Sequence, residues 1–261
     1  MAHPVLETRG LTIRFGGHVA VDGVSAAFHA GTLTAIVGPN GAGKTTYFNL
    51  ISGQLPATAG HVLLDGVDIT GAGAATRARR GIGRAFQLTN LFPNLSVHEN
   101  VRLAVQARAG GGADILSRWS SRIDWIERAD QFIEAANLAD KRDIAAVALP
   151  HGDKRKLEVA IMMALEPHVF MFDEPTAGMS VDDVPVILDL IKALKGAGDK
   201  TILLVEHKMD VVRSLADRIV VLHNGRLVAD GEPAQVISSP VAQEAYLGIA
   251  AKPVAAGAAN G

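Results

Sequence analysis

Residues 38–45, which read Gly-Pro-Asn-Gly-Ala-Gly-Lys-Thr, match the pattern G-x-x-x-x-G-K-[ST]. The apolar run Leu33–Val37 precedes this loop, and the helix-like segment Thr45–Ser52 follows it. In this strand–loop–helix context the pattern predicts phosphate binding, because glycines let successive backbone N–H groups point inward and the helix N-terminus adds partial positive charge. We expect the Lys44 ammonium near β- and γ-phosphates and the Thr45 hydroxyl on Mg²⁺. The alternative is a glycine-rich turn with a solvated lysine.

A pair of adjacent acids forms a second candidate site. Asp173 and Glu174 follow the apolar run Val169–Phe172, so we expect both carboxylates at the C-terminal end of a buried strand, where ligands gather in open α/β sheets. Asp173 is the candidate Mg²⁺ partner, because a hard cation shared with phosphates prefers carboxylate oxygen or its bound water. Glu174 is the candidate to orient or deprotonate an attacking water. Alone, these acids could be solvated loop residues; with the loop at 38–45 they favour a phosphate-hydrolysing site.

The composition is that of a folded globular protein. Of the 261 residues, 48% are hydrophobic and 20% are charged, which is too apolar for a disordered chain and enough for one large domain or a domain with a subdomain. Lys and Arg number 25 against 27 Asp and Glu, so the formal net charge of −2 gives no bulk attraction to nucleic acid or anionic lipid. There is no cysteine, which excludes disulfides, thiolate zinc sites and a cysteine nucleophile.

The sequence also lacks the signals of a membrane-spanning or secreted chain. No apolar run approaches the roughly 18 residues that a spanning helix needs. The segment Met1–Gly10 contains Glu7 and Arg9 and no hydrophobic block, so we do not expect a secretory signal. We expect a soluble, cytosolic chain whose role at a membrane would come through a partner.

Alternating strand-like and helix-like segments indicate an α/β core. The apolar runs of strand length are Leu33–Val37, His61–Leu64, Val169–Phe172, Thr201–Val205 and Arg218–Leu222. Several are continuously apolar, as in parallel strands that are buried on both faces. Helical periodicity covers Asp124–Asp140 and the apolar positions Val184, Ile187, Leu188, Ile191 and Leu194, ending near Gly196. The stretch 97–166 has no convincing strand, which predicts a helical subdomain inserted between sheet strands.

Further short segments lie in order around the two phosphate motifs. They are Phe15 in Arg14–Gly17, Gln87 in Arg84–Leu88, Leu149–Asp153 before the helix-like Lys154–Leu165, Ala177–Ser180, and His207 in Val205–His207. Together with residues 38–45 and 173–174, they resemble the ATP-binding subunits of ABC transporters over residues 6–248. Taken singly, Gln87 and His207 would be polar loop residues and Phe15 a core aromatic.

This resemblance implies the ABC ATPase fold. That fold is α/β, with a P-loop NTPase core whose sheet is mainly parallel, an N-terminal antiparallel β region and an inserted helical subdomain. The implied segments are 1–86 and 167–248 for the two parts of the nucleotide-binding core, 87–166 for the glutamine (Q) loop and the helical, signature-bearing subdomain, and 249–261 for a flexible tail.

The resemblance also implies ATP and Mg²⁺ as cofactors and assigns roles by position. The implied catalytic residues are Glu174, His207, Gln87 and Lys44, and the implied metal-binding residues are Thr45, Gln87 and Asp173. Phe15 would stack on adenine, and the other implied nucleotide contacts are Val19, Asn40, Gly41, Ala42, Gly43, Lys44, Thr45 and Thr46. The family's signature, which acts on ATP held by a partner's phosphate loop, corresponds to Leu149, Pro150, His151, Gly152 and Asp153.

Within the family, the chain is most similar to the LivG-type subunits of branched-chain amino acid importers. The segments that carry this similarity are Phe15–Gly17, Arg84–Gln87, Leu149–Gly152, Lys156–Ala160 and Val205–Asp210. The implied partners are a second ATPase subunit, two membrane permease subunits and, indirectly, a periplasmic binding protein, without nucleic acid. The implied place is the cytoplasmic face of the inner membrane. Importers of urea or other small solutes share much of the pattern and are an alternative.

Two segments depart from the family pattern. The signature usually reads LSGGQ, but here Pro150 replaces serine, His151 replaces glycine and Asp153 replaces glutamine. Proline offers a phosphate neither a hydroxyl nor a backbone N–H, and an acid near a helix start suits the helix dipole but not a phosphate. Ser180 stands where aspartate is usual. A homodimer would place the weak signature in both sites, so we expect a heterodimer with a similar but distinct subunit.

Three rival classes of function remain open. A soluble ABC-type ATPase that works on nucleic acid or ribosomes usually has two ATPase domains or a long coiled coil, and neither pattern occurs here. A small-molecule P-loop kinase would need an acceptor pocket and has no use for His207 or a signature. A non-catalytic ATP-binding scaffold is disfavoured by the intact Glu174.

Overall fold

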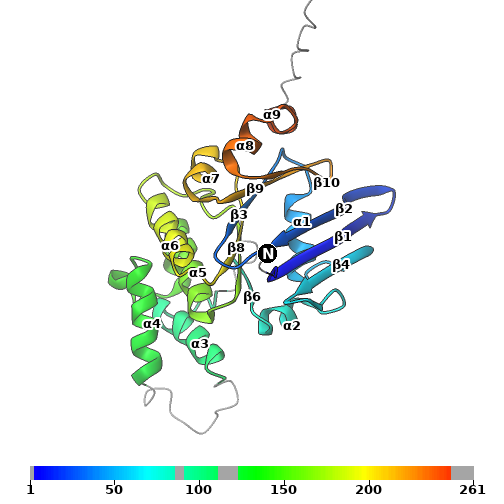
Figure 1. Cartoon of the computed structure of the whole chain (residues 1–261). Helices are drawn as coiled ribbons and strands as arrows, with labels where there is room; N and C mark the ends of the chain where they lie inside the picture. Colours follow the sequence, from blue (N-terminus) through cyan, green and yellow to red (C-terminus); the bar gives the residue numbers. More distant parts are fainter. Residues whose placement is uncertain (1–2, 86–90, 111–122, 248–261) are drawn as a thin grey trace, which may run out of the picture.

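The computed structural model describes residues 3–85, 91–110 and 123–247, and its strands form two sheets (Figure 1). The strands are β1 (Leu6–Phe15), β2 (His18–Phe28), β3 (Leu33–Val37), β4 (Ala59–Leu64), β5 (Val67–Asp68), β6 (Ile82–Ala85), β7 (Val169–Asp173), β8 (Thr201–Val205), β9 (Arg218–His223) and β10 (Arg226–Gly231). The helices are α1 (Lys44–Ser52), α2 (Ala74–Arg79), α3 (Val97–Arg108), α4 (Ile123–Ala135), α5 (His151–Leu165), α6 (Val184–Gly196), α7 (Met209–Leu215), α8 (Pro233–Ser238) and α9 (Pro240–Leu247), and short 3-10 helices are η3 (Ala139–Lys141) and η4 (Ala146–Ala148).

The larger sheet has six strands in the order β10-β9-β3-β8-β7-β6. Neighbours from β9 to β6 run parallel, and β10 pairs antiparallel with β9 at the edge. Every residue of β3, β7 and β8 is buried, as expected for parallel strands covered on both faces. The apolar runs predicted at 33–37, 169–172, 201–205 and 218–222 are therefore confirmed as neighbouring strands of one mainly parallel sheet.

The smaller sheet is antiparallel and has the order β2-β1-β4-β5. It contains the run predicted at 61–64 and forms the N-terminal β region that the resemblance implied. In Figure 1 it lies on the opposite side of the central sheet from helices α3 to α6. The long hairpin of β1 and β2 turns at Gly16 and Gly17, so Phe15 and His18 are Cα partners at its tip.

Helix α1 lies between the two sheets. Its buried Tyr47 and Phe48 belong to one cluster with Phe28 of the small sheet and with Val169 and Met171 of the large sheet. The Tyr47 hydroxyl is hydrogen-bonded to the Thr8 hydroxyl across this layer, at 2.7 Å. The helix that follows the phosphate loop is thus fixed from both sides, which limits how far the loop can move.

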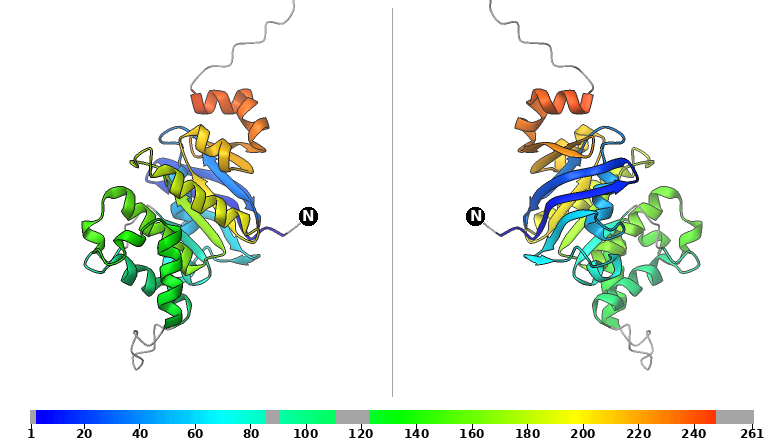
Figure 2. Two further views of the ribbon diagram at one scale, coloured as in Figure 1. Left: turned by 90° about the vertical axis from the view of Figure 1, so that its left-hand side faces the viewer. Right: turned by 90° about the vertical axis from the view of Figure 1, so that its right-hand side faces the viewer.

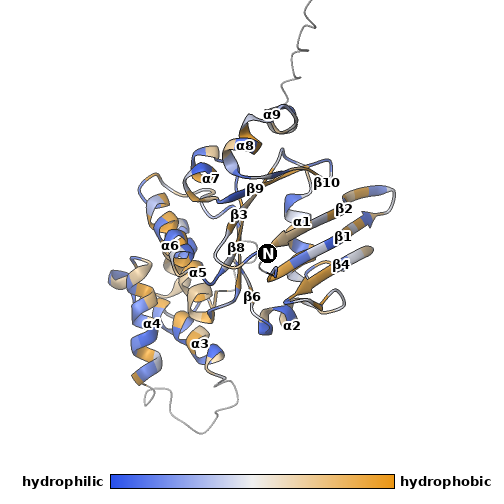
Figure 3. Cartoon of the chain, in the orientation of Figure 1, coloured by the Kyte–Doolittle hydropathy of each residue, from blue (hydrophilic) through white to orange (hydrophobic). Residues whose placement is uncertain are grey.

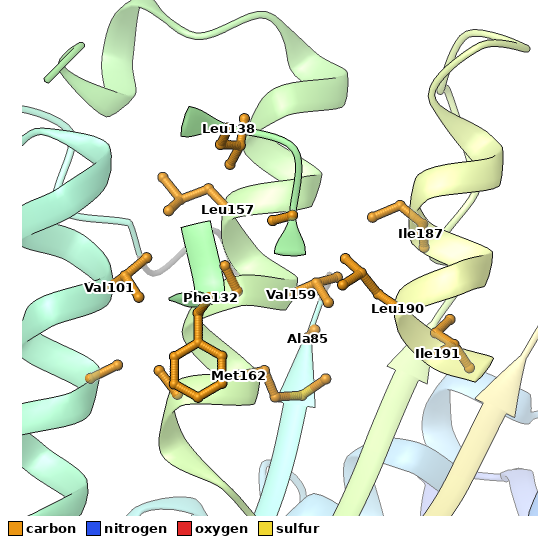
Figure 4. Close-up of a cluster of buried hydrophobic side chains, with 14 of the residues drawn as sticks. Ala85, Val101, Phe132, Leu138, Leu157, Val159, Met162, Ile187, Leu190 and Ile191 are labelled. Atoms are coloured by element: carbon orange, nitrogen blue, oxygen red, sulfur yellow. The ribbon is translucent and has the colours of Figure 1, made fainter. Parts of the chain in front are cut away.

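The other face of the large sheet is covered by helices. Residues Phe170 and Phe172, which alternate with Val169 and Met171 along β7, pack against α3 to α6. Figure 4 shows members of this cluster that come from several helices, including Val101, Phe132, Leu157, Val159 and Ile187, together with Ala85 of β6. Helices α4 and α6 alternate between hydrophilic and hydrophobic residues (Figure 3), as helices with one buried face do.

The helical subdomain consists of α3, α4 and α5, which come between β6 and β7 in the sequence and project to one side of the core (Figure 2). In the described part of 97–166 there is no strand, in agreement with the prediction. The helix predicted over 124–140 is wrong at its end, because α4 stops at Ala135 and Asn137 takes a left-handed conformation (φ +54°) that ends the helix.

The sequence analysis did not single out β6 and β10. Strand β6 is short and carries Gly83 and Arg84, and β10 is a partly exposed edge strand with Arg226 and Asp230. Neither has the apolar run that marks a buried strand. None of the helices in the described ranges combines the length and apolarity needed to cross a bilayer.

Candidate active site

The phosphate loop begins where β3 ends and leads directly into α1. A Cβ atom at Gly38 would lie 2.1 Å from the Leu222 carbonyl oxygen, so no larger residue fits there. At Gly43, with φ +96°, a Cβ would lie 2.5 Å from the Ala20 carbonyl oxygen. These close backbone approaches explain the glycines at both positions of the motif.

Lys44 is the first residue of α1 and is buried. Its Nζ donates hydrogen bonds to the carbonyl oxygens of Gly38 (2.8 Å) and Pro39 (3.0 Å). Burial lowers the pKa of the Lys44 ammonium, and the negative charges of Glu174 and Asp173 act in the opposite direction. A partly desolvated ammonium interacts more strongly with a phosphate than a solvated one does, because the local dielectric constant is lower.

A cavity of about 410 Å³ opens over the loop. Its lining comprises Phe15, His18, Ala20, Asn40, Gly41, Ala42, Gly43, Lys44, Thr45, Thr46, Glu174 and His207. All of the predicted nucleotide contacts except Val19 are in this set, and Val19 lies between two lining residues that the sequence analysis missed, His18 and Ala20. Phe15 is 50% exposed at the hairpin tip, so it has a free surface on which a planar base can stack.

Asp173 is the last residue of β7, and its side chain is buried. Its Oδ2 accepts a hydrogen bond from the guanidinium of Arg84 at 2.8 Å, and both side chains are only 6% exposed. Burial raises the pKa of Asp173, and the Arg84 charge lowers it. Arg84 was not predicted as a site residue, because nothing in the local sequence shows that it contacts a residue 89 positions away.

Glu174 and His207 stand at the ends of the neighbouring strands β7 and β8. Their side chains, both more than one-third exposed, approach within hydrogen-bond distance, with His207 Nε2 2.8 Å from Glu174 Oε1. Glu174 has a left-handed backbone (φ +53°), which is uncommon for a residue with a side chain and typical of functional sites. Its backbone N–H donates to the Val205 carbonyl oxygen, at 2.9 Å.

Glu206, next to His207, is a further residue that the sequence analysis missed. Its carboxylate is buried and accepts hydrogen bonds from the Thr176 hydroxyl (2.5 Å) and from the backbone N–H groups of His207 (2.8 Å) and Lys208 (3.3 Å). Glu206 therefore connects the turn after β7 to the turn after β8, and it fixes the backbone from which His207 projects.

A metal at this site would depend on the nucleotide for part of its coordination. In the described ranges no group of three or more His, Cys, Asp or Glu residues could hold a metal ion. Asp173 and Thr45 supply a carboxylate and a hydroxyl, which suit a hard cation that takes its remaining ligands from phosphate and water. Gln87, the third predicted metal ligand, lies outside the described residues.

The signature segment lies away from this cavity. None of the residues from Leu149 to Asp153 lines it. Leu149 is buried, Pro150 is the N-cap of α5, and His151 is exposed in the first turn. The helix therefore begins at His151 and not at Lys154 as predicted, because a proline at a helix start loses no intrahelical hydrogen bond and need not delay the helix.

The charge of Asp153, in the signature segment, is paired within the chain. Its side chain is buried and pairs with Lys141 (2.6 Å) and Lys156 (3.3 Å). Lys156 also pairs with Asp183 (2.5 Å), whose other oxygen accepts a hydrogen bond from the Ser180 hydroxyl (2.7 Å). This network of charges connects the signature helix to the segment around Ser180, which follows β7.

The ABC transporter family model matches residues 21–177, more than half of the chain. The chain belongs to the ABC transporter family. Among its ABC relatives, the high-affinity branched-chain amino acid transport ATP-binding protein BraF of Pseudomonas aeruginosa is 38% identical over 254 residues, covering 95% of this chain and 99% of the relative. LivG of Escherichia coli (strain K12), which has the same description, is 36% identical over 253 residues, with 95% and 99% covered.

Solved ATP-binding cassettes share the fold of this ABC family member. The ADP conformation of MJ1267, an ATP-binding cassette of an ABC transporter, superposes with a TM-score of 0.79 at 30% identity, covering 95% of this chain and 100% of that chain. The cassette MJ0796, in a dimeric structure bound to ADP and Pi, gives a TM-score of 0.75 at 25% identity, with 87% and 98% covered. The resemblance and the fold predicted from the sequence are both confirmed.

Proposed function

We propose that this chain is the ATP-hydrolysing subunit of a membrane importer for branched-chain or related amino acids. The observation that carries the proposal is that one cavity joins the phosphate loop, Glu174 and His207 in a chain that is 36–38% identical, over 95% of its length, to subunits of branched-chain amino acid transporters. The alternative of a small-molecule kinase is less well supported, because a kinase would need an acceptor pocket and would have no use for the signature segment.

In the proposed mechanism, the loop N–H groups and Lys44 bind the phosphates, and Phe15 stacks on the base. Mg²⁺, held through Thr45 and Asp173 and by Gln87, would neutralise charge on the phosphates. Glu174 polarises the attacking water, and His207 orients Glu174 and donates a hydrogen bond towards the γ-phosphate. The protein forms no covalent bond to the substrate in this mechanism, because phosphoryl transfer depends mainly on positioning the reactants and neutralising the phosphate charge.

The proposed assembly contains two ATPase subunits, two permease subunits and, indirectly, a periplasmic binding protein, at the cytoplasmic face of the membrane. The position of the signature supports it. His151 is exposed and the segment lies outside this chain's own cavity, so it is available to ATP bound by a second subunit. The gain and loss of the γ-phosphate would then close and open the pair, in the manner of other nucleotide switches.

The test of the proposed catalytic role is Glu174→Gln. We expect this variant to bind ATP normally and to hydrolyse it at least about 100-fold more slowly, because a general base is lost while the phosphate contacts stay. ATP turnover is measured with the partner subunits present, and nucleotide affinity is measured by equilibrium binding. Unchanged turnover would remove Glu174 from the mechanism, and turnover that does not depend on the permease subunits would argue against a transporter.

A further inference from the structure

Arg84 joins the two halves of the phosphate site through one buried side chain. From β6 it reaches Asp173 at the end of β7 and also α1, where its NH1 donates to Asn49 Oδ1 (2.6 Å) and to Ser52 Oγ (2.9 Å). The guanidinium carbon lies 5.6 Å from the centre of the Phe48 ring, also on α1. Helix α1 carries Lys44 and Thr45 at its start, so the same residue contacts the helix of the phosphate loop and the acid opposite it.

The geometry leaves Asp173 with one oxygen bound and one available. Arg84 binds Oδ2, and among the described residues no hydrogen bond to Oδ1 is found. A buried carboxylate without a fixed partner would pay a large desolvation cost and could turn between orientations. The planar guanidinium instead fixes the carboxylate plane, because its donors have a rigid arrangement.

We propose that Arg84 is a positioning residue, which orients Asp173 with respect to α1 and thereby sets the affinity of the site for nucleotide-bound Mg²⁺. This inference rests on the proposed ATPase function. Arg84 does not line the cavity over the phosphate loop, and its guanidinium binds Asp173 and side chains of α1, so the role that we assign to it acts through Asp173. Partners of metal-binding side chains typically change metal affinity by about 10- to 100-fold when they are removed.

A second buried arginine provides a matched control. Arg77 is 2% exposed and also contacts α1, where it donates hydrogen bonds to the carbonyl oxygens of Leu50 and Ile51, both at 2.7 Å. It further donates to the carbonyl oxygens of Thr70 and Ala72. Within the described ranges it has no hydrogen bond to Asp173, and it does not line the cavity. Removal of Arg77 therefore disturbs the same helix without releasing the acid.

The experiment compares Arg84→Gln, Arg84→Lys and Arg77→Ala in the full chain. ATP binding is measured by calorimetry first in EDTA and then over a Mg²⁺ titration, and thermal denaturation reports folding. For Arg84→Gln we expect binding in EDTA within about twofold of the parent, and a half-saturating Mg²⁺ concentration raised about tenfold or more. Arg84→Lys keeps the charge but not the planar donors, so its shift should be smaller. Arg77→Ala should lower the melting temperature and leave the Mg²⁺ dependence unchanged.

The outcomes separate this inference from the proposed function. If folded Arg84→Gln or Arg84→Lys shows the parent's Mg²⁺ dependence, or if Arg77→Ala shifts it equally, the positioning role is wrong. Arg84→Lys retains a buried cation beside Asp173. If Arg84→Gln does not fold, the Mg²⁺ dependence of Arg84→Lys is therefore the measurement that tests the positioning role. A parent chain that binds no ATP at any Mg²⁺ concentration would instead overturn the proposed function.

Discussion

Lys44→Ala should remove most of the affinity for ATP. The variant loses an ammonium that burial has partly desolvated and that the proposal places on the phosphates. Hydrogen bonds to charged groups contribute about 2 kcal/mol or more, so we expect binding at least about 30-fold weaker. Calorimetric titration with ATP measures it.

The control for Lys44→Ala is the melting temperature of the variant, which shows whether it still folds. Lys44 itself lines the open cavity, so water can take the place of its ammonium and donate to the carbonyl oxygens of Gly38 and Pro39. The melting temperature should therefore change little. A variant that unfolds would make weak binding uninformative, and one that binds ATP as tightly as the parent would contradict the assigned role of Lys44.

At the residue scale, the functional side chains that could be predicted are those that belong to short, continuous sequence motifs. Lys44, Thr45, Asp173 and Glu174 each follow an apolar strand within a short motif, and strand ends in a parallel sheet meet at one edge. Arg84 and Glu206 were missed, because their partners Asp173 and Thr176 lie 89 and 30 positions away and no short pattern records such pairs. His18 was missed since its place depends on the turn of a hairpin.

At the scale of elements, the charge network of α5 explains how the unusual signature is accommodated. Asp153, buried in the first turn, has lysine partners from η3 and from its own helix, and Lys156 extends the network to Asp183. A Cβ at Gly152 would lie 2.6 Å from Asp183 Oδ2, so the helix start and this acid are in close contact. The acid at 153 is a structural partner of two lysines.

Lys156→Met should lower the free energy of unfolding by about 3 kcal/mol. The substitution keeps most of the volume but leaves Asp183 without its cation and Asp153 with only Lys141, and breaking a buried ion pair typically has a cost of this size. Denaturant unfolding measures the change. The control is Lys192→Met, which removes an exposed pair with Asp189 and should cost less than about 1 kcal/mol. Equal effects of the two substitutions would contradict a buried network.

The predicted strands and helices agree with the structure where burial imposes a regular pattern of apolar residues. Strands β3, β7 and β8 were predicted because both of their faces are covered and most of their positions are apolar. Helix α6 was predicted because one apolar face repeats at helical spacing. The end of α4 was misplaced, since the periodicity continues past Asn137 while its backbone conformation ends the helix. Strand β10 pairs with β9 across the two-residue turn Asn224-Gly225, a hairpin signal that the sequence analysis did not use.

At the scale of the whole molecule, the predicted division into core and helical subdomain depended on resemblance more than on pattern. The sequence showed no strand over 97–166, but it did not show that α3 to α5 pack beside β6 on the face opposite to α1. Such packing is decided by contacts between distant segments. The boundaries at 86, 166 and 248 stay predictions, since residues 86–90 and 248–261 lie outside the described ranges.

The chain should not form a stable ATP-bound homodimer. Pro150 offers a partner's γ-phosphate no hydroxyl, and Asp153 is committed to lysines of its own subunit. We expect native mass spectrometry of the Glu174→Gln chain with Mg²⁺ and ATP to show a monomer, and addition of a distinct ATPase subunit to produce a heterodimer. A parent chain that forms a stable, fast-hydrolysing homodimer would contradict this.

The residues that line the two ends of the cavity come from different sheets. Phe15, His18 and Ala20 belong to the antiparallel hairpin, whereas Lys44, Glu174 and His207 follow strands of the parallel sheet. In the proposed function the base lies against the hairpin and the bond is cleaved at the parallel sheet, so base preference and cleavage rate would be set by different elements and could change separately. A protein engineer could redesign the hairpin tip for an unnatural nucleotide while leaving the cleavage machinery intact.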